Sequence, residues 1–254
     1  MIEFAHVTKS YPTGEIVLDD VTFTVTQGDF VVITGKSGAG KTTIGRLLIK
    51  DLNPTKGKIE IDGQDLSKIK NGDIPALRRK IGFIFQDYKI IPDKTVYENI
   101  ELALEISGLD RKKIPERIGK LLELVGIPGK ENLFPLQLAG GELQRVSIAR
   151  AIASNPPILF ADEPTGNLDR ETSIEIFKLL KKINEGGTTI LMVTHDVTLI
   201  DIHEARHIHI QNGKIIKDHG GNDLPKVEEK SEKDHNDNVK EDKPAHKSKE
   251  NKKD

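Results

Sequence analysis

Residues 30–43 read Phe30-Val31-Val32-Ile33-Thr34-Gly35-Lys36-Ser37-Gly38-Ala39-Gly40-Lys41-Thr42-Thr43. The first five residues form a short apolar run, which is typical of a buried parallel strand. The next eight have the spacing G-x-x-x-x-G-K-[ST], and a helical pattern follows from Thr43 to Lys50. A strand, a glycine-rich loop and a helix in this order predict a loop whose backbone N–H groups surround the phosphates of a nucleotide.

Each residue type in this loop has a chemical reason to be there. A side chain at Gly35 or Gly40 is expected to obstruct the phosphates. Lys41 is suited to reach the β- and γ-phosphates, and the Thr42 hydroxyl is suited to ligate Mg²⁺. The expected nucleotide-binding residues of the loop are Gly35, Lys36, Ser37, Gly38, Ala39, Gly40, Lys41, Thr42 and Thr43. The alternative is a glycine-rich connection that binds no nucleotide.

Strand and helix patterns alternate along the rest of the chain. Apolar or alternating runs that predict strands lie at 21–26, 81–85, 158–161, 189–194 and 206–210. Helical periodicity lies at 96–106, 114–125, 142–153 and 172–183. This alternation favours an α/β fold with a mainly parallel sheet. The long helical stretch that ends at Ala153 predicts a helical subdomain, about 90–153, inserted into the sheet domain.

Polar side chains follow three of the predicted strands, at Gln86, at Asp162 and Glu163, and at His195. Ligands of parallel sheets bind beyond the carboxyl ends of the strands, so we expect these side chains to meet the glycine-rich loop. Asp162 suits Mg²⁺ opposite Thr42, and Glu163 is placed to orient an attacking water. Phosphoryl transfer to water depends on positioning and charge stabilisation, which such a set can supply.

The composition of the 254 residues excludes several classes of protein. The 38 basic and 40 acidic residues give a net charge of −2, which does not indicate a nucleic-acid or membrane surface. Without cysteine, disulfides, thiolate zinc sites and cysteine nucleophiles are excluded. No run reaches the roughly 18 apolar residues of a membrane span, so a cytoplasmic protein is expected.

The excess of charge, 31% of all residues, is concentrated at the C-terminus. Residues 226–254 hold nine Lys, nine Asp or Glu and three apolar residues. Such a segment cannot bury enough apolar surface to offset the entropy of ordering, so we expect disorder. The predicted organisation is one domain over 1–220 and a mixed-charge tail over 221–254, with a docking segment as the alternative reading of the tail.

Further motifs give the chain a resemblance to the ATP-binding-cassette (ABC) ATPases from residue 1 to about 220. Leu138-Ala139-Gly140-Gly141-Glu142-Leu143-Gln144-Arg145 resembles the family's signature sequence. Gln86 matches the Q-loop, Asn167-Leu168-Asp169 the D-loop and His195 the switch histidine. Tyr11 stands where the family places an aromatic ring that stacks on adenine, although a turn tyrosine before Pro12 is the alternative.

This resemblance implies a P-loop NTPase core with a parallel sheet, an antiparallel β-subdomain and an inserted helical subdomain. It implies ATP and Mg²⁺ as ligands, with Glu163, His195 and Gln86 as catalytic residues and with Thr42, Gln86 and Asp162 near the metal. It also implies a homodimer that encloses two ATP molecules, because Gly140 and Gly141 leave N–H groups bare at a helix start and face the γ-phosphate bound by the other subunit.

The signature departs from the family pattern at Ala139, where a serine is usual. The loss of one hydroxyl donor to a charged acceptor weakens binding by about 1.5–3 kcal/mol. We therefore expect weaker ATP-driven dimerisation or slower turnover. The expected nucleotide-contacting residues of the signature are Ala139, Gly140, Gly141 and Glu142. A glutamate at the position of Glu142 is usual in one branch of the family.

Segments 74–79, 81–89, 95–99 and 162–169 resemble the branch that contains cell-division ATPases. That branch implies an integral membrane partner, conformational control of peptidoglycan hydrolases and a peripheral location on the inner face of the membrane. The rival reading is a lipoprotein-releasing or macrolide exporter, because the 162–169 segment is shared with both. A nucleotide-dependent scaffold with little hydrolysis is a further alternative.

Three histidines with the spacing H-x₃-H-x-H, namely His203, His207 and His209, could suggest a metal site. His207 and His209 alternate along an apparent strand without a nearby carboxylate pattern. We therefore interpret all three as ordinary surface histidines.

Overall fold

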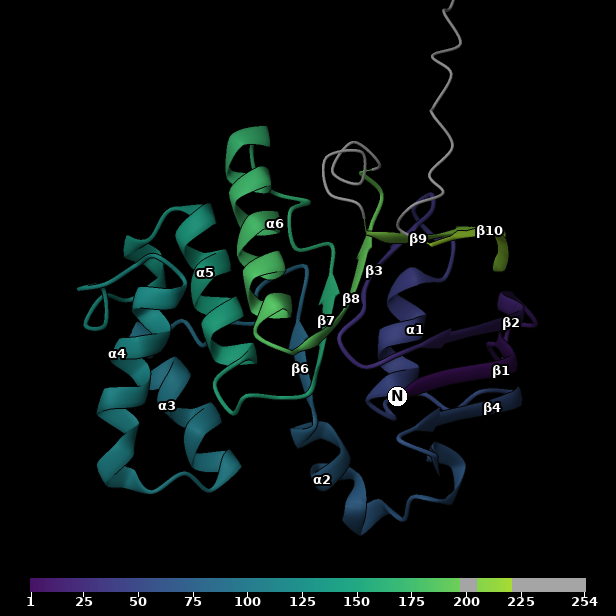
Figure 1. The fold of residues 1–254 in the computed structure, drawn as a ribbon, viewed down its shortest axis with the longest axis horizontal. Coiled ribbons are helices and arrows are strands. Elements are labelled where there is room, and N and C mark those ends of the chain that lie inside the picture. The colour runs from purple at the N-terminus through teal and green to yellow at the C-terminus, as the bar shows by residue number, and fades with distance from the viewer. Residues whose placement is uncertain (197–204, 221–254) are drawn as a thin grey trace, which may run out of the picture. The chain divides into compact units, whose positions relative to one another are not determined.

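The structure is a computed structural model, and it describes residues 1–196 and 205–220. Sixteen helices and strands, besides short 3-10 turns, follow one another in these two ranges (Figure 1). The strands are β1 (Ile2–Ser10), β2 (Ile16–Val25), β3 (Phe30–Thr34), β4 (Lys56–Ile61), β5 (Gln64–Asp65), β6 (Ile81–Ile84), β7 (Ile158–Asp162), β8 (Thr189–Thr194), β9 (Arg206–Gln211) and β10 (Lys214–His219). The helices are α1 (Lys41–Leu48), α2 (Ile74–Arg79), α3 (Val96–Ser107), α4 (Ile114–Leu124), α5 (Gly140–Ala151) and α6 (Arg170–Glu185).

The central sheet has the strand order β10-β9-β3-β8-β7-β6. Strands β9, β3, β8, β7 and β6 pair in parallel, and only β10 is antiparallel to its neighbour β9. Because β3, β7 and β8 run parallel to one another, the loops after these strands all leave the same edge of the sheet. The predicted α/β fold with a mainly parallel sheet is confirmed, and the glycine-rich loop leaves its middle.

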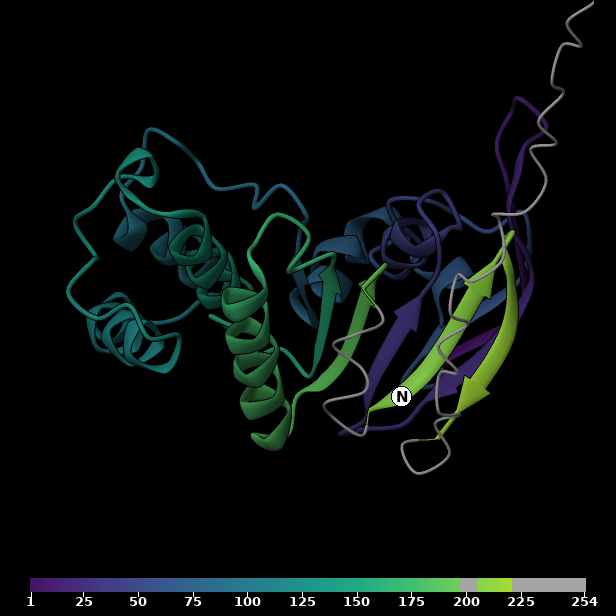
Figure 2. The same ribbon diagram turned by 90° about the horizontal axis from the view of Figure 1, so that it is seen from above.

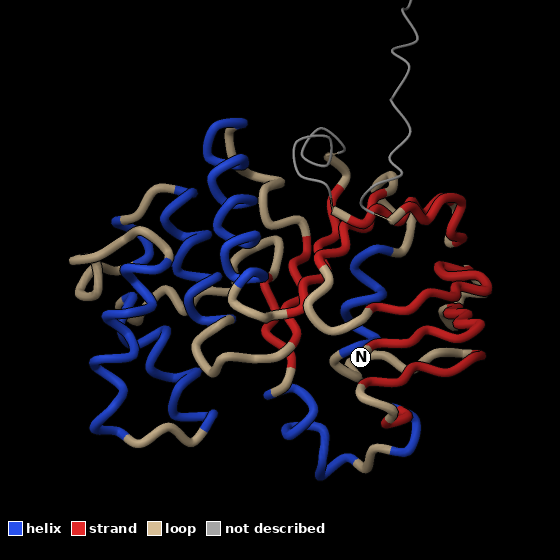
Figure 3. Tube along the Cα trace, viewed as in Figure 1, coloured by secondary structure: helices blue, strands red, loops and turns tan. Residues whose placement is uncertain are grey.

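A second sheet with the order β2-β1-β4-β5 is antiparallel throughout (Figure 3). Register shifts interrupt the pairing of β1 with β2 between Phe4 and Ser10. The predicted strand at 21–26 is therefore only the regular half of β2, which begins at Ile16. Alternation is lost where bulges change which face a residue occupies.

Two hydrophobic clusters lie on opposite faces of the central sheet. Alternate residues of β3 divide between them: Val31 and Ile33 belong to the cluster with the antiparallel sheet and α1, whereas Val32 packs with α3–α6. Figure 2 shows α6 on one side of the sheet and α1 on the other. This division follows from the period of two along a strand buried on both faces.

Helices α3, α4 and α5 follow β6 in the chain and precede β7, as the periodicity predicted. Their packing uses apolar stripes such as Ile114, Ile118 and Leu121 on α4, all of which are buried. Helix α3 begins at a capping box, in which Thr95 Oγ1 accepts from the Glu98 N–H at 3.2 Å and Glu98 accepts from the Thr95 N–H at 2.7 Å. The predicted tail, 221–254, lies outside the described residues.

Candidate active site

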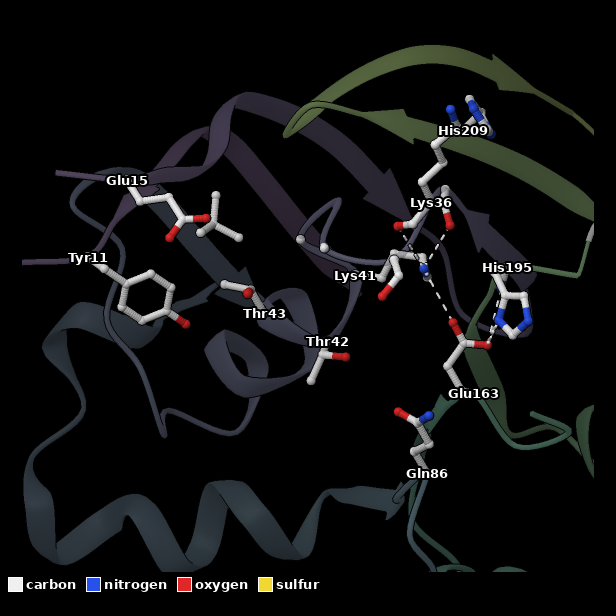
Figure 4. A pocket seen from close by; sticks show the side chains of 15 residues that line it. Tyr11, Glu15, Lys36, Lys41, Thr42, Thr43, Gln86, Glu163, His195 and His209 are labelled. Carbon is white, nitrogen blue, oxygen red and sulfur yellow. Dashed lines mark hydrogen bonds and ion pairs between the residues drawn. The ribbon is translucent and has the colours of Figure 1, made fainter. Parts of the chain in front are cut away.

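A cavity of about 780 Å³ opens above the loop between β3 and α1 (Figure 4). This volume is in the range of small-molecule sites. Its lining residues come from the turn between β1 and β2, the start of β2, the glycine-rich loop, α1, β9 and the segments just after β6, β7 and β8. They are Tyr11, Glu15, Val17, Gly35, Lys36, Ser37, Gly38, Gly40, Lys41, Thr42, Thr43, Gln86, Glu163, His195 and His209. Most of the predicted loop residues, together with Tyr11, Gln86, Glu163 and His195, thus meet in one cavity.

The glycines of the loop are required for a reason that the sequence did not indicate. A Cβ at Gly35 would lie 2.3 Å from the carbonyl oxygen of Ile210, on β9. Gly40 has a φ of +99°, and a Cβ there would lie 2.6 Å from the carbonyl oxygen of Val17. This constraint adds to the predicted one, in which a side chain here would obstruct the phosphates. Both glycines allow the loop to pack closely against β2 and β9.

Lys41 is buried and its ammonium group has three acceptors. Nζ lies 2.8 Å from the Gly35 carbonyl oxygen, 3.2 Å from that of Lys36 and 3.3 Å from Oε1 of Glu163. An ammonium group has three N–H donors, so this arrangement engages them all. Because only 5% of Lys41 and 9% of Glu163 are exposed, solvent screens this ion pair little.

The second oxygen of Glu163 faces His195. Oε2 lies 2.8 Å from Nδ1 of the imidazole and accepts the His195 backbone N–H at 3.2 Å. The side chain of His195 is 62% exposed, so the rest of its ring faces open space. Glu163 has a φ of +47°, a left-handed conformation that a non-glycine residue adopts at a cost of about 1–3 kcal/mol. Such strain at the end of a buried strand is common in catalytic sites.

Thr42 and Asp162 form the other polar pair. The Thr42 hydroxyl donates to Oδ1 of Asp162 at 3.0 Å, and Asp162 is buried beneath it. Burial raises the pKa of Asp162, and the hydrogen bond from Thr42 partly opposes this. A buried carboxylate whose charge is incompletely compensated, next to a hydroxyl, is a set of hard oxygen donors that fits Mg²⁺.

The signature residues lie apart from this cavity. Ala139 precedes helix α5, and neither it nor Gly140, Gly141 and Glu142 lines the cavity. Glu142 forms an ion pair with Lys130 and accepts the Ala139 backbone N–H at 3.1 Å, and the hydrogen bond from Lys130 lowers its pKa. Within one chain, therefore, the two predicted groups of nucleotide-contacting residues do not meet.

Asp169, of the predicted D-loop, caps helix α6. Its carboxylate accepts from the Thr172 backbone N–H at 2.9 Å and from the Thr172 hydroxyl at 2.6 Å. Asn167, in the same loop, donates to the Gln86 carbonyl oxygen at 3.4 Å. These contacts join the loop after β7 to the segment after β6.

Three cavity residues were missed by the sequence analysis, namely Glu15, Val17 and His209. Glu15 and Val17 belong to no motif and reach the cavity because the start of β2 and the turn before it pass beside the loop. The interpretation of His207 and His209 as surface residues is wrong, because both are half-buried on β9 and both contact the Thr34 hydroxyl. His203 lies outside the described residues. Across the described ranges, no group of three potential ligands among His, Cys, Asp and Glu is arranged to hold a metal ion.

Residues 18–166 match the family model described as ABC transporter. The chain therefore belongs to the ABC transporter family, and it is an ATPase of this family.

Within the family, the chain is similar to the cell division ATP-binding protein FtsE of several bacteria. It is 48% identical to that of Streptococcus pneumoniae over 218 residues, which cover 86% of this chain and 95% of the relative. It is 46% identical to that of Bacillus subtilis, covering 86% of this chain and 96% of the relative. It is 44% identical to that of Escherichia coli K12, covering 87% of this chain and 98% of the relative. The cassette MJ0796, solved as a dimer in a post-hydrolysis state with ADP and Pi, superposes with a TM-score of 0.80 and 36% identity, covering 88% of this chain and 100% of that chain.

Proposed function

We propose that this chain is the ATP-hydrolysing subunit of a cell-division membrane complex. It dimerises on ATP and drives conformational change in an FtsX-like integral membrane partner that controls peptidoglycan hydrolases. The observation that supports this most is the Lys41–Glu163–His195 cluster in a chain that is 43–48% identical to FtsE proteins over most of its length.

In this proposal the loop residues 35–43 hold the phosphates of ATP and Tyr11 stacks on the adenine. Lys41 exchanges Glu163 for the β- and γ-phosphates, because its three acceptors in the structure include that carboxylate. Thr42, Asp162 and Gln86 hold Mg²⁺, which when bound neutralises charge on the phosphate oxygens.

Once released from Lys41, Glu163 accepts a hydrogen bond from the attacking water and orients it toward the γ-phosphorus. His195 donates from Nδ1 to Oε2 of Glu163, which holds its ring beside the γ-phosphate. Its other ring nitrogen donates to the γ-phosphate in the imidazolium form, in which both nitrogens carry a hydrogen. Gln86 lines the cavity just after β6, and its backbone oxygen accepts a hydrogen bond from Asn167. Its position therefore links the nucleotide to the surface of the helical side.

The signature completes the site from a second copy of the chain. Gly140 and Gly141 begin helix α5 and lie away from the chain's own cavity. Their N–H groups at a helix N-terminus suit the γ-phosphate bound by the partner subunit. Dimerisation on ATP follows from this arrangement, since two nucleotides then bridge two chains.

The membrane partner docks beside β6 and α3. A groove of about 530 Å³ there is lined by apolar and basic side chains, among them Arg78, Phe83, Phe85, Ile106 and Arg150. Ile106 is 62% exposed. No helix in the described part of the chain combines the length and apolar character needed to cross a bilayer. A helix of the partner that carries apolar and acidic residues would fit this groove.

The variant Glu163→Gln tests the enzymatic part of the proposal. Hydrolysis should fall by at least about 100-fold, because the amide is a poor acceptor for the water's proton. ATP affinity should rise, because the charge that repels the phosphates is removed. Stable ATP-dependent dimers of Glu163→Gln, measured by light scattering, are expected. Hydrolysis at the unmodified rate would show that Glu163 has another role.

The membrane partner is tested separately by co-purification of membrane proteins with the full chain. An FtsX-like protein should be retained, and Phe83→Asp in the groove should abolish retention without loss of ATP binding. Retention of a lipoprotein or macrolide exporter subunit instead would assign the chain to that alternative. Retention that Phe83→Asp leaves unchanged would place the docking surface elsewhere.

A further inference from the structure

His209 lines the ATP cavity but has no part in the site as proposed above. It lies with His195 and Lys36 at the end of the cavity opposite Tyr11 (Figure 4). Strand β9 runs parallel to β3, and His209 is the register partner of Thr34, the last residue before the phosphate-binding loop. His209 therefore lies on the strand next to β3, beside the point where the phosphate-binding loop begins.

One ring nitrogen of His209 is anchored and the other is not. Nδ1 lies 2.8 Å from the Thr34 hydroxyl, which also lies 2.6 Å from Nε2 of His207. The hydroxyl can donate to only one of the two rings. When it donates to His209, the hydrogen of the neutral imidazole resides on Nε2. For Nε2, no hydrogen-bond partner is found within 1–196 and 205–220, and the atom is not among the buried unpartnered ones.

The charges around His209 are mainly positive. Lys217 on β10 is its register partner, and in Figure 4 the Lys36 side chain extends toward it. Burial, followed by Lys217 and Lys41, lowers the pKa of His209. His207 is the titratable neighbour on β9 itself. The acidic residues that line the same cavity are Glu15 and Glu163.

We propose that His209 is a further phosphate ligand, whose Nε2 donates a hydrogen bond to the terminal phosphate of ATP. This inference rests on the proposed nucleotide site. The negative charge of the phosphate favours the imidazolium form, so ATP binding takes up a proton at His209. Linkage then requires ATP to bind more tightly as the pH falls from about 8 to about 6.

His209→Phe tests this proposal, with His219→Phe as the matched control. His219 is a half-buried histidine of the neighbouring strand β10 that does not line the cavity. Affinities for ATP and ADP are measured by calorimetry with Mg²⁺ at about pH 6 and about pH 8. His209→Phe should weaken ATP binding about tenfold at the lower pH and less at the higher pH. The affinity for ADP should change by less than about twofold.

Proton uptake by the unmodified chain is an independent measurement that needs no variant. Binding enthalpies in two buffers of different ionisation heat should show uptake with ATP, and His209→Phe should remove it while His219→Phe retains it. Equal ATP affinity and equal uptake in His209→Phe and the unmodified chain would overturn the inference alone. Failure of the unmodified chain to bind ATP would overturn the proposed function instead.

Discussion

Ala139 is the residue at which this chain departs most clearly from the ABC signature. It precedes α5 with a φ of −70° and a ψ of 161°, the extended conformation of an N-cap, but its methyl group accepts no hydrogen bond. Glu142 reaches back to the Ala139 N–H, so half of a capping box is present. The missing half is the hydroxyl that would accept an N–H of the first turn.

Ala139→Ser should therefore stabilise the chain by about 1 kcal/mol, the usual gain from an N-cap. For a domain of this size the thermal midpoint should rise by about 2–4 °C, as measured by differential scanning calorimetry. The same hydroxyl should strengthen ATP-dependent dimers of Glu163→Gln. The side chains introduced by Ala139→Thr and Ala139→Val have nearly the same shape, so comparing these variants separates the effect of the hydroxyl from that of side-chain size. Equal midpoints for these two would contradict the capping argument.

At the scale of the element, α5 links the signature to the segment after Gln86. Near the end of this helix, Arg150 donates to the carbonyl oxygens of Lys89 at 2.6 Å and Tyr88 at 2.8 Å. Tyr88 and Lys89 have φ values of +59° and +50°, so two successive residues are in the left-handed region. In the described ranges no carboxylate pairs with Arg150, whose guanidinium thus serves mainly to hold this strained turn.

Arg150→Met should release the turn and slow ATP hydrolysis. The Lys89 carbonyl oxygen loses this donor and that of Tyr88 keeps the Ser147 hydroxyl at 3.4 Å, so hydrogen exchange of residues 86–91 should accelerate. Arg117→Met is the control, because Arg117 also donates to backbone carbonyls, those of Ile152 and Ala153 just after α5. It should lower stability comparably without faster exchange at 86–91. Faster exchange in both variants would mean that general loosening of α5 is the cause.

Element boundaries show where the sequence is informative. The strands at 30–34 and 189–194 begin and end as predicted, because apolar runs buried on both faces carry a clear signal. Helix α6 was predicted from Thr172 but begins at Arg170, because its polar first turn, capped by Asp169, has no apolar periodicity. Boundaries set by side-chain caps are invisible to a search for hydrophobic patterns.

The candidate site was predictable to the extent that its residues sit in local motifs. Lys41, Glu163 and His195 each follow a strand that the apolar pattern identifies. His209 and Glu15 could not be found in this way, since they reach the cavity only through the pairing of β9 with β3 and the path of β2. Pairing between distant strands is not encoded in any short stretch.

At the scale of the whole molecule, the two cores on either side of the central sheet predict independent responses to mutation. Ile44 on α1 and Ile176 on α6 are fully buried in different clusters. Ile44→Val and Ile176→Val should each cost about 0.5–1.5 kcal/mol of unfolding free energy. In the double variant the costs should add to within about 0.5 kcal/mol, as measured by denaturant unfolding. A larger deviation would show that the sheet transmits strain between the cores.

The same division has a consequence for how such chains diverge. A substitution to a smaller side chain in one core is compensated by a larger side chain at a neighbouring position of the same core. This is because the strands of the central sheet separate the two sets of side chains. Among descendants of this sequence, correlated substitutions should group on one side of the sheet or the other. Strand β3, whose Val31 and Val32 face opposite cores, must remain compatible with the substitutions in both.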